Sequence, residues 1–119
     1  MTARVASHRA DELAITVITV EEQLSGWYRQ LRRAKDVAHL ARIYQRLTDT
    51  VTHLSRLRIL TFSEQAILHF KTLKASRLGV GSMDLRIAAI ALEHQASVAT
   101  RNVRDFQRIP NLVVEDWSK

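Results

Sequence analysis

The order of apolar and polar positions along the chain predicts strands that alternate with helices. Residues 13–19 are uncharged and rich in β-branched side chains, which is typical of a strand buried on both faces. Residues 19–33 and 37–54 carry apolar side chains at three- and four-residue steps, the spacing of two amphipathic helices. Thr19, with Glu22 three positions later, predicts a capping box at the start of the first helix. We expect the two helices to form a hairpin.

The second half of the chain continues this alternation. Ser63 is expected to open a helix that runs to about Ser76, and Ser82 is expected to be the N-cap of a helix over 84–95. That last helix is rich in Ala and apolar almost all round, so it should pack deep against a sheet as the central helix. The shorter expected elements are a strand over 58–61, a strand over 96–100, a turn or helix over 103–107 and a strand over 112–115.

Residues 1–10 are rich in Ala, and their apolar and polar side chains do not alternate with a period of two, so we expect a short helix and no strand there. Strands that alternate with helices indicate an α/β fold, with a small, mostly parallel sheet joined by right-handed crossovers. A length of 119 residues suits a single domain over 1–119 with one core.

Composition narrows the class of protein. The apolar fraction is 46%, and three Gly and one Pro are too few for a disordered or fibrous chain. The absence of Cys excludes disulfides, thiolate zinc sites and cysteine nucleophiles, and it suits a reducing cytoplasm. No apolar run is long enough for a signal peptide core or a membrane span. We therefore expect a soluble, cytoplasmic protein without a membrane partner.

Positive charge points to a polyanionic partner. Lys and Arg number 18 against 12 Asp and Glu, and the net charge is +6. Most of these cations are Arg, whose planar fork grips phosphate and stacks on bases, so the bias favours nucleic acid over an acidic protein. Arg29, Arg32 and Arg33 share one helix face and would follow a phosphate backbone, although a solvated charged stripe explains the same pattern more often. Two further candidates for RNA contact are Arg101 and Arg104.

Three carboxylates fall where an open sheet binds ligands, beyond the carboxyl ends of strands. Glu22 lies in the helix after the first strand, Asp84 opens the central helix, and Asp105 follows the strand that ends at Thr100. Oxygen ligands at one rim suit Mg²⁺ or Mn²⁺ and metal-assisted cleavage of a phosphodiester. Taken singly, Glu22 also completes a capping box and Asp84 also complements a helix dipole. The five His residues show no zinc-ligand spacing.

Longer motifs carry a resemblance to a known family. They are Gly81-Ser-Met-Asp84-Leu-Arg-Ile-Ala-Ala-Ile-Ala-Leu92, Ser97-Val-Ala-Thr100-Arg-Asn102-Val-Arg-Asp105-Phe106 and Glu115-Asp-Trp117. They closely resemble the C-terminal half of PIN-domain proteins of the VapC toxin type, and Ile15 to Gly26 resembles the second-strand motif of that family. The resemblance implies a three-layer PIN-like fold and an endoribonuclease that depends on Mg²⁺ or Mn²⁺. It also implies a dimeric toxin, inhibited by a cognate antitoxin protein, that cuts loops of tRNA or ribosomal RNA.

The resemblance also implies roles for individual residues. Glu22, Asp84 and Asp105 fall on acidic positions that hold the metal and carry catalysis. Asn102 falls on a neighbouring position of the same metal site, and Thr100 would orient its loop.

One part of the family pattern is missing. The family begins with a hydrophobic strand in the middle of the sheet, which ends in an Asp-Thr-Asn-like motif, and this chain has neither. We therefore expect an N-terminally shortened PIN-like fold without that first strand. Either the sheet closes without it, or a neighbouring chain lends structure, or Met1 is an internal methionine of a longer protein.

Three hypotheses follow for the function. The leading one is a VapC-type endoribonuclease that acts through Glu22, Asp84 and Asp105. The alternative is a PIN-like module that binds RNA or an antitoxin without cleavage, and the missing aspartate favours it. A DNA-binding protein of other ancestry is disfavoured, because no helix-turn-helix is recognisable.

Overall fold

The structure of the protein is a computed structural model that describes residues 4–6 and 13–116. Five strands form one sheet in the order β3-β2-β1-β4-β5. The pairs β2–β3 and β4–β5 are parallel, and β1 is antiparallel to both β2 and β4. The carboxyl ends of β2, β3, β4 and β5 therefore share one edge of the sheet, as the α/β prediction requires. The strands are β1 (Arg4–Ala6), β2 (Leu13–Thr16), β3 (Arg58–Leu60), β4 (Ser97–Thr100) and β5 (Val114–Asp116).

The central strand is the main difference from the prediction. A helix was expected over 1–10, but Arg4–Ala6 forms β1, in which Val5 pairs with Ala14 on one side and Val98 on the other. A gap between β2 and β4 would leave backbone groups of both strands unpaired, and this cost outweighs a weak local preference for helix. Strand β1 of this chain thus fills the gap between β2 and β4, and it runs antiparallel to both. Residues 1–3 and 7–10 lie outside the described residues.

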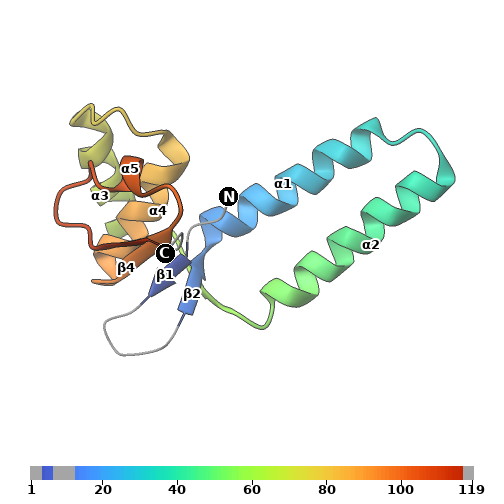
Figure 1. The fold of residues 1–119 in the computed structure, drawn as a ribbon, viewed down its shortest axis with the longest axis horizontal. Coiled ribbons are helices and arrows are strands. Elements are labelled where there is room, and N and C mark those ends of the chain that lie inside the picture. Colours follow the sequence, from blue (N-terminus) through green and yellow to red (C-terminus); the bar gives the residue numbers. More distant parts are fainter. Residues whose placement is uncertain (1–3, 7–12, 117–119) are drawn as a thin grey trace.

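Two long helices form the predicted hairpin, α1 (Val17–Arg33) and α2 (Val37–Leu54). The hairpin projects from the rest of the molecule, which therefore measures 49 Å along its longest axis and 32 Å across (Figure 1). The remaining helices are α3 (Glu64–Ala75), α4 (Ser82–Glu93) and α5 (Val103–Phe106). Helix α3 lies along α4, and α4 contacts β4. Among the described residues, none of the helices is long and apolar enough to cross a membrane.

The helix starts confirm one predicted cap and correct two. Ser63 caps α3 as expected, and its Oγ accepts a hydrogen bond of 3.2 Å from the amide of Ala66. The N-cap of α1 is Thr16, so the predicted capping box at Thr19 is wrong and the preceding strand is three residues shorter than expected. The β-branched run simply continues into the first helical turn. The N-cap of α4 is Gly81, one position before the predicted Ser82.

The core lies around α4, as its composition predicted. Ala88, Ala89, Ile90 and Ala91 are fully buried, and the small side chains of the three Ala residues let α3 and the sheet approach closely. Phe106 of α5 is 1% exposed and belongs to the same cluster. This packing fixes α4 and α5 relative to the sheet edge where the strands end.

Thr19 provides a test of this helix start. Its side chain is 1% exposed, and its hydroxyl has no hydrogen-bond partner within the described part of the chain. Thr19→Val removes a desolvated polar group at nearly constant volume, so we expect the free energy of unfolding to rise by about 1 kcal/mol. Thermal unfolding should show a melting temperature higher by roughly 3–6 °C. The matched change Thr16→Val removes the N-cap of α1 and should lower the melting temperature. A lower melting temperature for Thr19→Val would contradict the conclusion that the Thr19 hydroxyl has no partner among the described residues.

Candidate functional site

The candidate site lies at the edge where four strands end. Strand β2 leads straight into α1, which carries Glu22 one turn beyond its start. Strand β4 leads through Asn102 into α5, which carries Asp105. Asp84 lies in the first turn of α4, the helix buried against the sheet. Three separate segments of the chain therefore bring the predicted acidic residues to one edge.

Hydrogen bonds join three of the predicted site residues directly. The side-chain amide of Asn102 donates to Asp105 Oδ2 at 3.1 Å and to Asp84 Oδ2 at 3.5 Å. The backbone N–H of Asn102 donates to Thr100 Oγ1 at 3.0 Å, and Thr100 itself is 2% exposed. Thr100 thus fixes the loop, and Asn102 holds the two aspartates on either side of it.

Burial and neighbouring negative charge raise the pKa values of Asp84 and Glu22. Partial burial raises the pKa of Asp84 above its usual value, and the negative charge of Asp105 raises it further. The pKa of Glu22 is also raised, first by partial burial although the residue keeps much solvent contact, and then by Asp84. Negative charge is therefore concentrated at this edge, and Asp84 is the aspartate whose charge acts on Glu22.

The donor set fits a hard divalent cation in chemical type. Carboxylate and amide oxygens are the ligands of Mg²⁺ and Mn²⁺, and a cation would relieve the repulsion that adds to the effect of burial on the two pKa values. Asp84 and Asp105 are the two carboxylates joined through one amide. Over residues 4–6 and 13–116, however, no three acidic or His side chains are close enough together to hold a metal ion on their own. Glu22 interacts electrostatically with Asp84, but Glu22, Asp84 and Asp105 do not form a group of three ligands for one metal ion.

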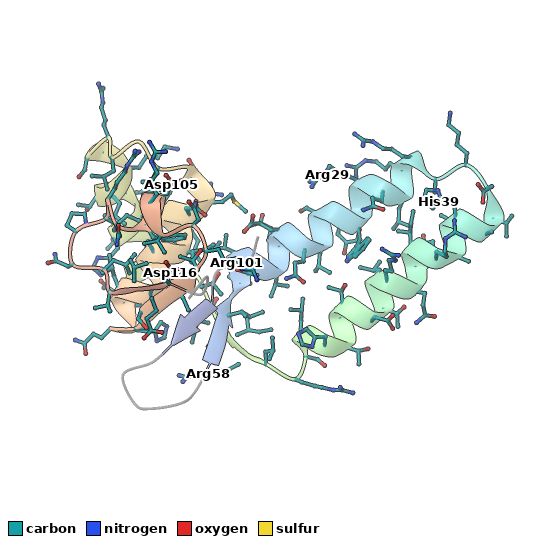
Figure 2. The ribbon with its side chains drawn as sticks, in the orientation of Figure 1. Arg29, His39, Arg58, Arg101, Asp105 and Asp116 are labelled. Atoms are coloured by element: carbon teal, nitrogen blue, oxygen red, sulfur yellow. The ribbon has the colours of Figure 1, made fainter. Side chains whose placement is uncertain are left out.

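The predicted arginines fall in two places. Arg101 and Arg104 are exposed on the segment that carries Asn102 and Asp105. Arg29, Arg32 and Arg33 are exposed on the distal part of α1, and Figure 2 shows Arg29 on the hairpin, well away from Asp105. The structure therefore does not bring the α1 arginines to the acidic edge.

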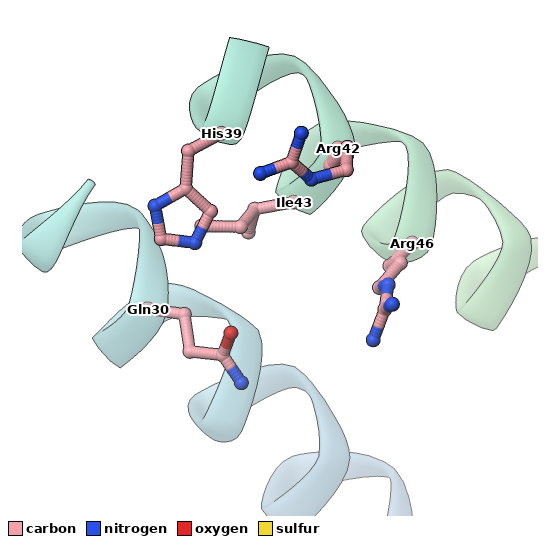
Figure 3. A pocket seen from close by; sticks show the side chains of 5 residues that line it. All are labelled: Gln30, His39, Arg42, Ile43 and Arg46. Atoms are coloured by element: carbon pink, nitrogen blue, oxygen red, sulfur yellow. The ribbon is translucent and has the colours of Figure 1, made fainter. Parts of the chain in front are cut away.

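Two neighbouring hollows on the hairpin were not foreseen from the sequence. The first, of about 300 Å³, begins at Glu22 and is lined by Glu22, Gln23, Gly26, Trp27, Gln30 and Thr50. The second, of about 170 Å³, shares Gln30 with the first and is lined by Gln30, His39, Arg42, Ile43 and Arg46 (Figure 3). We call the two together the hairpin groove. The four-residue spacing of Arg42 and Arg46 was the only signal of it in the sequence.

Comparisons with known proteins identify the family. The sequence profile described as PIN domain matches residues 1–112. Ribonuclease VapC1 of Haemophilus influenzae (strain R2866) is 33% identical over 113 residues, which cover 92% of this chain and 77% of that protein. The chain is a PIN-domain protein of the VapC type. Its α/β fold, with the acidic residues at the carboxyl ends of the strands, is the fold expected of that family.

Two further comparisons agree with a VapC-type chain. Ribonuclease VapC2 of Rickettsia felis is 39% identical over 70 residues, which cover 56% of this chain but only 52% of that relative, about half of its length. The solved structure described as a toxin-antitoxin complex from Klebsiella pneumoniae superimposes with a TM-score of 0.61 at 27% identity. That superposition covers 84% of this VapC-type chain and 71% of the solved one.

Proposed function

We propose that this VapC-type chain is a divalent-metal-dependent endoribonuclease and the toxin of a toxin–antitoxin pair. The observation that carries the proposal is the pair Asp84 and Asp105, joined by the Asn102 amide at the carboxyl edge of the sheet. The names of the relatives, which are ribonucleases, support the reaction class. Because the described part of the chain holds no third acidic or His side chain close to this pair, metal binding is the decisive property to measure.

The side chains of this chain would divide the work as follows. Asp84 and Asp105 would hold the cation, Glu22 would add negative charge from the α1 side, and Asn102, anchored by Thr100, would keep the aspartates apart at a fixed spacing. When bound, Mg²⁺ or Mn²⁺ would supply an activated water and would stabilise the charge that develops on the phosphate. Arg101 and Arg104 are placed to contact the RNA backbone beside it.

Single-stranded loops of tRNA or ribosomal RNA are the proposed substrate. Their bases are unpaired and their backbone can adapt to the site, whereas an RNA duplex pairs its bases and holds its backbone in a fixed helical shape. The net charge of +6 and the exposed arginines favour such a polyanion. Activity on these RNAs would take place in the cytoplasm.

The test is cleavage of total tRNA by the purified chain in Mg²⁺, in Mn²⁺ and in EDTA. We expect fragments with either cation and none in EDTA, because phosphodiester cleavage at this site needs the ion. Isothermal titration with Mn²⁺ would measure the binding in parallel. A folded chain that binds RNA but cuts it under none of these conditions would contradict the proposal and support the non-cleaving PIN-like module instead.

An antitoxin protein is the proposed macromolecular partner, in line with the toxin-antitoxin complex that this fold matches. Helix α2 exposes an apolar stripe at heptad-like spacing, in which Val37 is 85%, Leu40 38%, Tyr44 53% and Val51 50% exposed. Apolar side chains exposed in a row are typical of a binding surface. The homodimer implied by the resemblance stays a prediction, which light scattering of the purified chain would test directly.

Tyr44→Glu tests the apolar stripe. The change places a charge in the middle of a surface that the antitoxin would cover, so we expect co-purification with the co-expressed antitoxin to fall at least tenfold. Ala38→Glu adds the same charge at an exposed position of α2 that lies about 120° round the helix from Tyr44, and the affinity should change less. Equal losses for both variants would show that charge on α2, and not the stripe, controls the complex.

A further inference from the structure

The hairpin groove joins the acidic edge to a basic pocket. Its first hollow includes Glu22, and its second is lined by Arg42 and Arg46 on α2, with Gln30 shared between them. Glu22 and Gln30 lie on the same helix eight positions apart, which corresponds to about 12 Å along the helix axis at 1.5 Å per residue. The groove therefore leads from the proposed cleavage site towards concentrated positive charge.

The basic pocket has the make-up of an anion site. Ile43, 2% exposed, is its apolar floor, and the polar side chains stand around it: Gln30 from α1, and His39, Arg42 and Arg46 from α2 (Figure 3). Arg42 and Arg46 lie one helical turn apart, so both guanidinium groups reach the same hollow. Among the described residues, no Asp or Glu lines it. Two guanidinium groups with an amide and an imidazole supply several N–H donors and no neutralising carboxylate.

A tryptophan connects the two hollows. The indole N–H of Trp27 donates to Thr50 Oγ1 at 2.8 Å, which ties the ring of α1 to α2. The guanidinium carbon of Arg46 lies 5.9 Å from the centre of the same ring. Trp27 thus lines the first hollow and orients an arginine of the second. Aromatic rings next to arginines are the usual combination in grooves that bind single-stranded nucleic acid.

We infer that the pocket formed by Gln30, His39, Arg42 and Arg46 binds a backbone phosphate of single-stranded RNA, while a neighbouring part of the same strand lies at the acidic edge. The inference rests on the proposed function in taking RNA as the substrate. An acidic protein segment would also be attracted by arginines, but the groove that runs from the pocket past Trp27 to Glu22 suits an extended strand with bases. The pocket binds and positions RNA, and takes no part in the chemistry.

The experiment measures RNA binding without cleavage. Fluorescence anisotropy with a labelled single-stranded oligouridine, in EDTA, gives the Kd of the full chain and of Arg42→Gln/Arg46→Gln. We expect the double variant to bind at least tenfold more weakly at low salt. The slope of log K against log salt should fall by about 0.7, the value for one phosphate contact on a single strand. Arg42→Lys/Arg46→Lys keeps the charge and should recover most of the affinity.

A matched pair controls for net charge. Arg56→Gln/Lys71→Gln removes two exposed positive charges outside the groove, and the affinity should change less than threefold. Equal weakening by both pairs would overturn the inference, and so would a wild-type chain that does not bind the oligouridine. Stronger competition for the pocket by an oligoglutamate peptide would assign it to an acidic protein segment and overturn it too. Because EDTA blocks cleavage, failure of the ribonuclease proposal would leave this binding result unchanged.

Discussion

Asp84→Asn is expected to lower kcat for metal-dependent RNA cleavage by roughly 10³-fold, the scale of losing one principal electrostatic group of an active site. Asp84 is one of the two carboxylates joined by Asn102, and its amide replacement keeps the shape but loses the charge that attracts the cation. Cleavage of tRNA under single-turnover conditions measures this loss. Asp49→Asn makes the same chemical change on the exposed face of α2 and should leave kcat within twofold.

The same variant should also be more stable than the wild type at neutral pH. The pKa of Asp84 in the folded chain is raised, so folding disfavours its charged form, and this penalty grows as pH rises from the unfolded pKa to the folded pKa and is constant above it. Below the unfolded pKa the carboxyl is protonated in both states and the penalty disappears. Urea unfolding should therefore favour Asp84→Asn at pH 7, with a difference that shrinks as the pH approaches 3. A variant less stable than the wild type at pH 7 would contradict this account.

Phe106→Ala should cost about 3–5 kcal/mol of unfolding free energy, the range for removing a buried aromatic ring. Phe106 is 1% exposed and anchors α5 in the core, directly after Asp105. Because domains are stable by only about 5–15 kcal/mol, we expect a large fall in the urea midpoint and the loss of cleavage at 37 °C.

Phe106→Leu is the control for this core change. Leucine keeps much of the buried volume, so the loss should be about 1–2 kcal/mol and cleavage should persist. If Phe106→Ala unfolded at the same urea concentration as the wild type, the ring would not hold α5 in place. If cleavage survived in a destabilised Phe106→Ala chain, Asp105 would not depend on this anchor.

The sequence predicted much of the fold because its strongest signals were local. The apolar periodicity of α1 and α2 and the all-round apolar surface of α4 follow from side chains that lie close in sequence. The position of β1 depends instead on strands far away along the chain, so a helical interpretation of residues 1–10 was wrong for Arg4–Ala6. The predicted caps were wrong by three positions at α1, where a β-branched run continues into the helix, and by one position at α4, where Gly81 precedes Ser82.

The candidate site was predictable in part, for a related reason. The predicted strand ends indicated which segments carry Glu22, Asp84 and Asp105, since parallel strands end at one edge of the sheet. The Asn102 bridge depends on how α4 and α5 pack, and the hairpin groove depends on how two helices cross. Such contacts between elements have no periodicity in the sequence, and the position of Trp27 in the groove depends on them.

The reversed central strand has a consequence for the order of folding. Strand β1 joins the two parallel strand pairs, and it does so by pairing Val5 with Val98, near opposite ends of the chain. Closing so long a loop costs chain entropy before the pairing of β1 with β4 can compensate for it, whereas the α1–α2 hairpin needs only local contacts. We therefore expect the hairpin to form early and the two halves of the sheet to join late. Since the acidic residues come from both halves, the site would be assembled in the last step of folding.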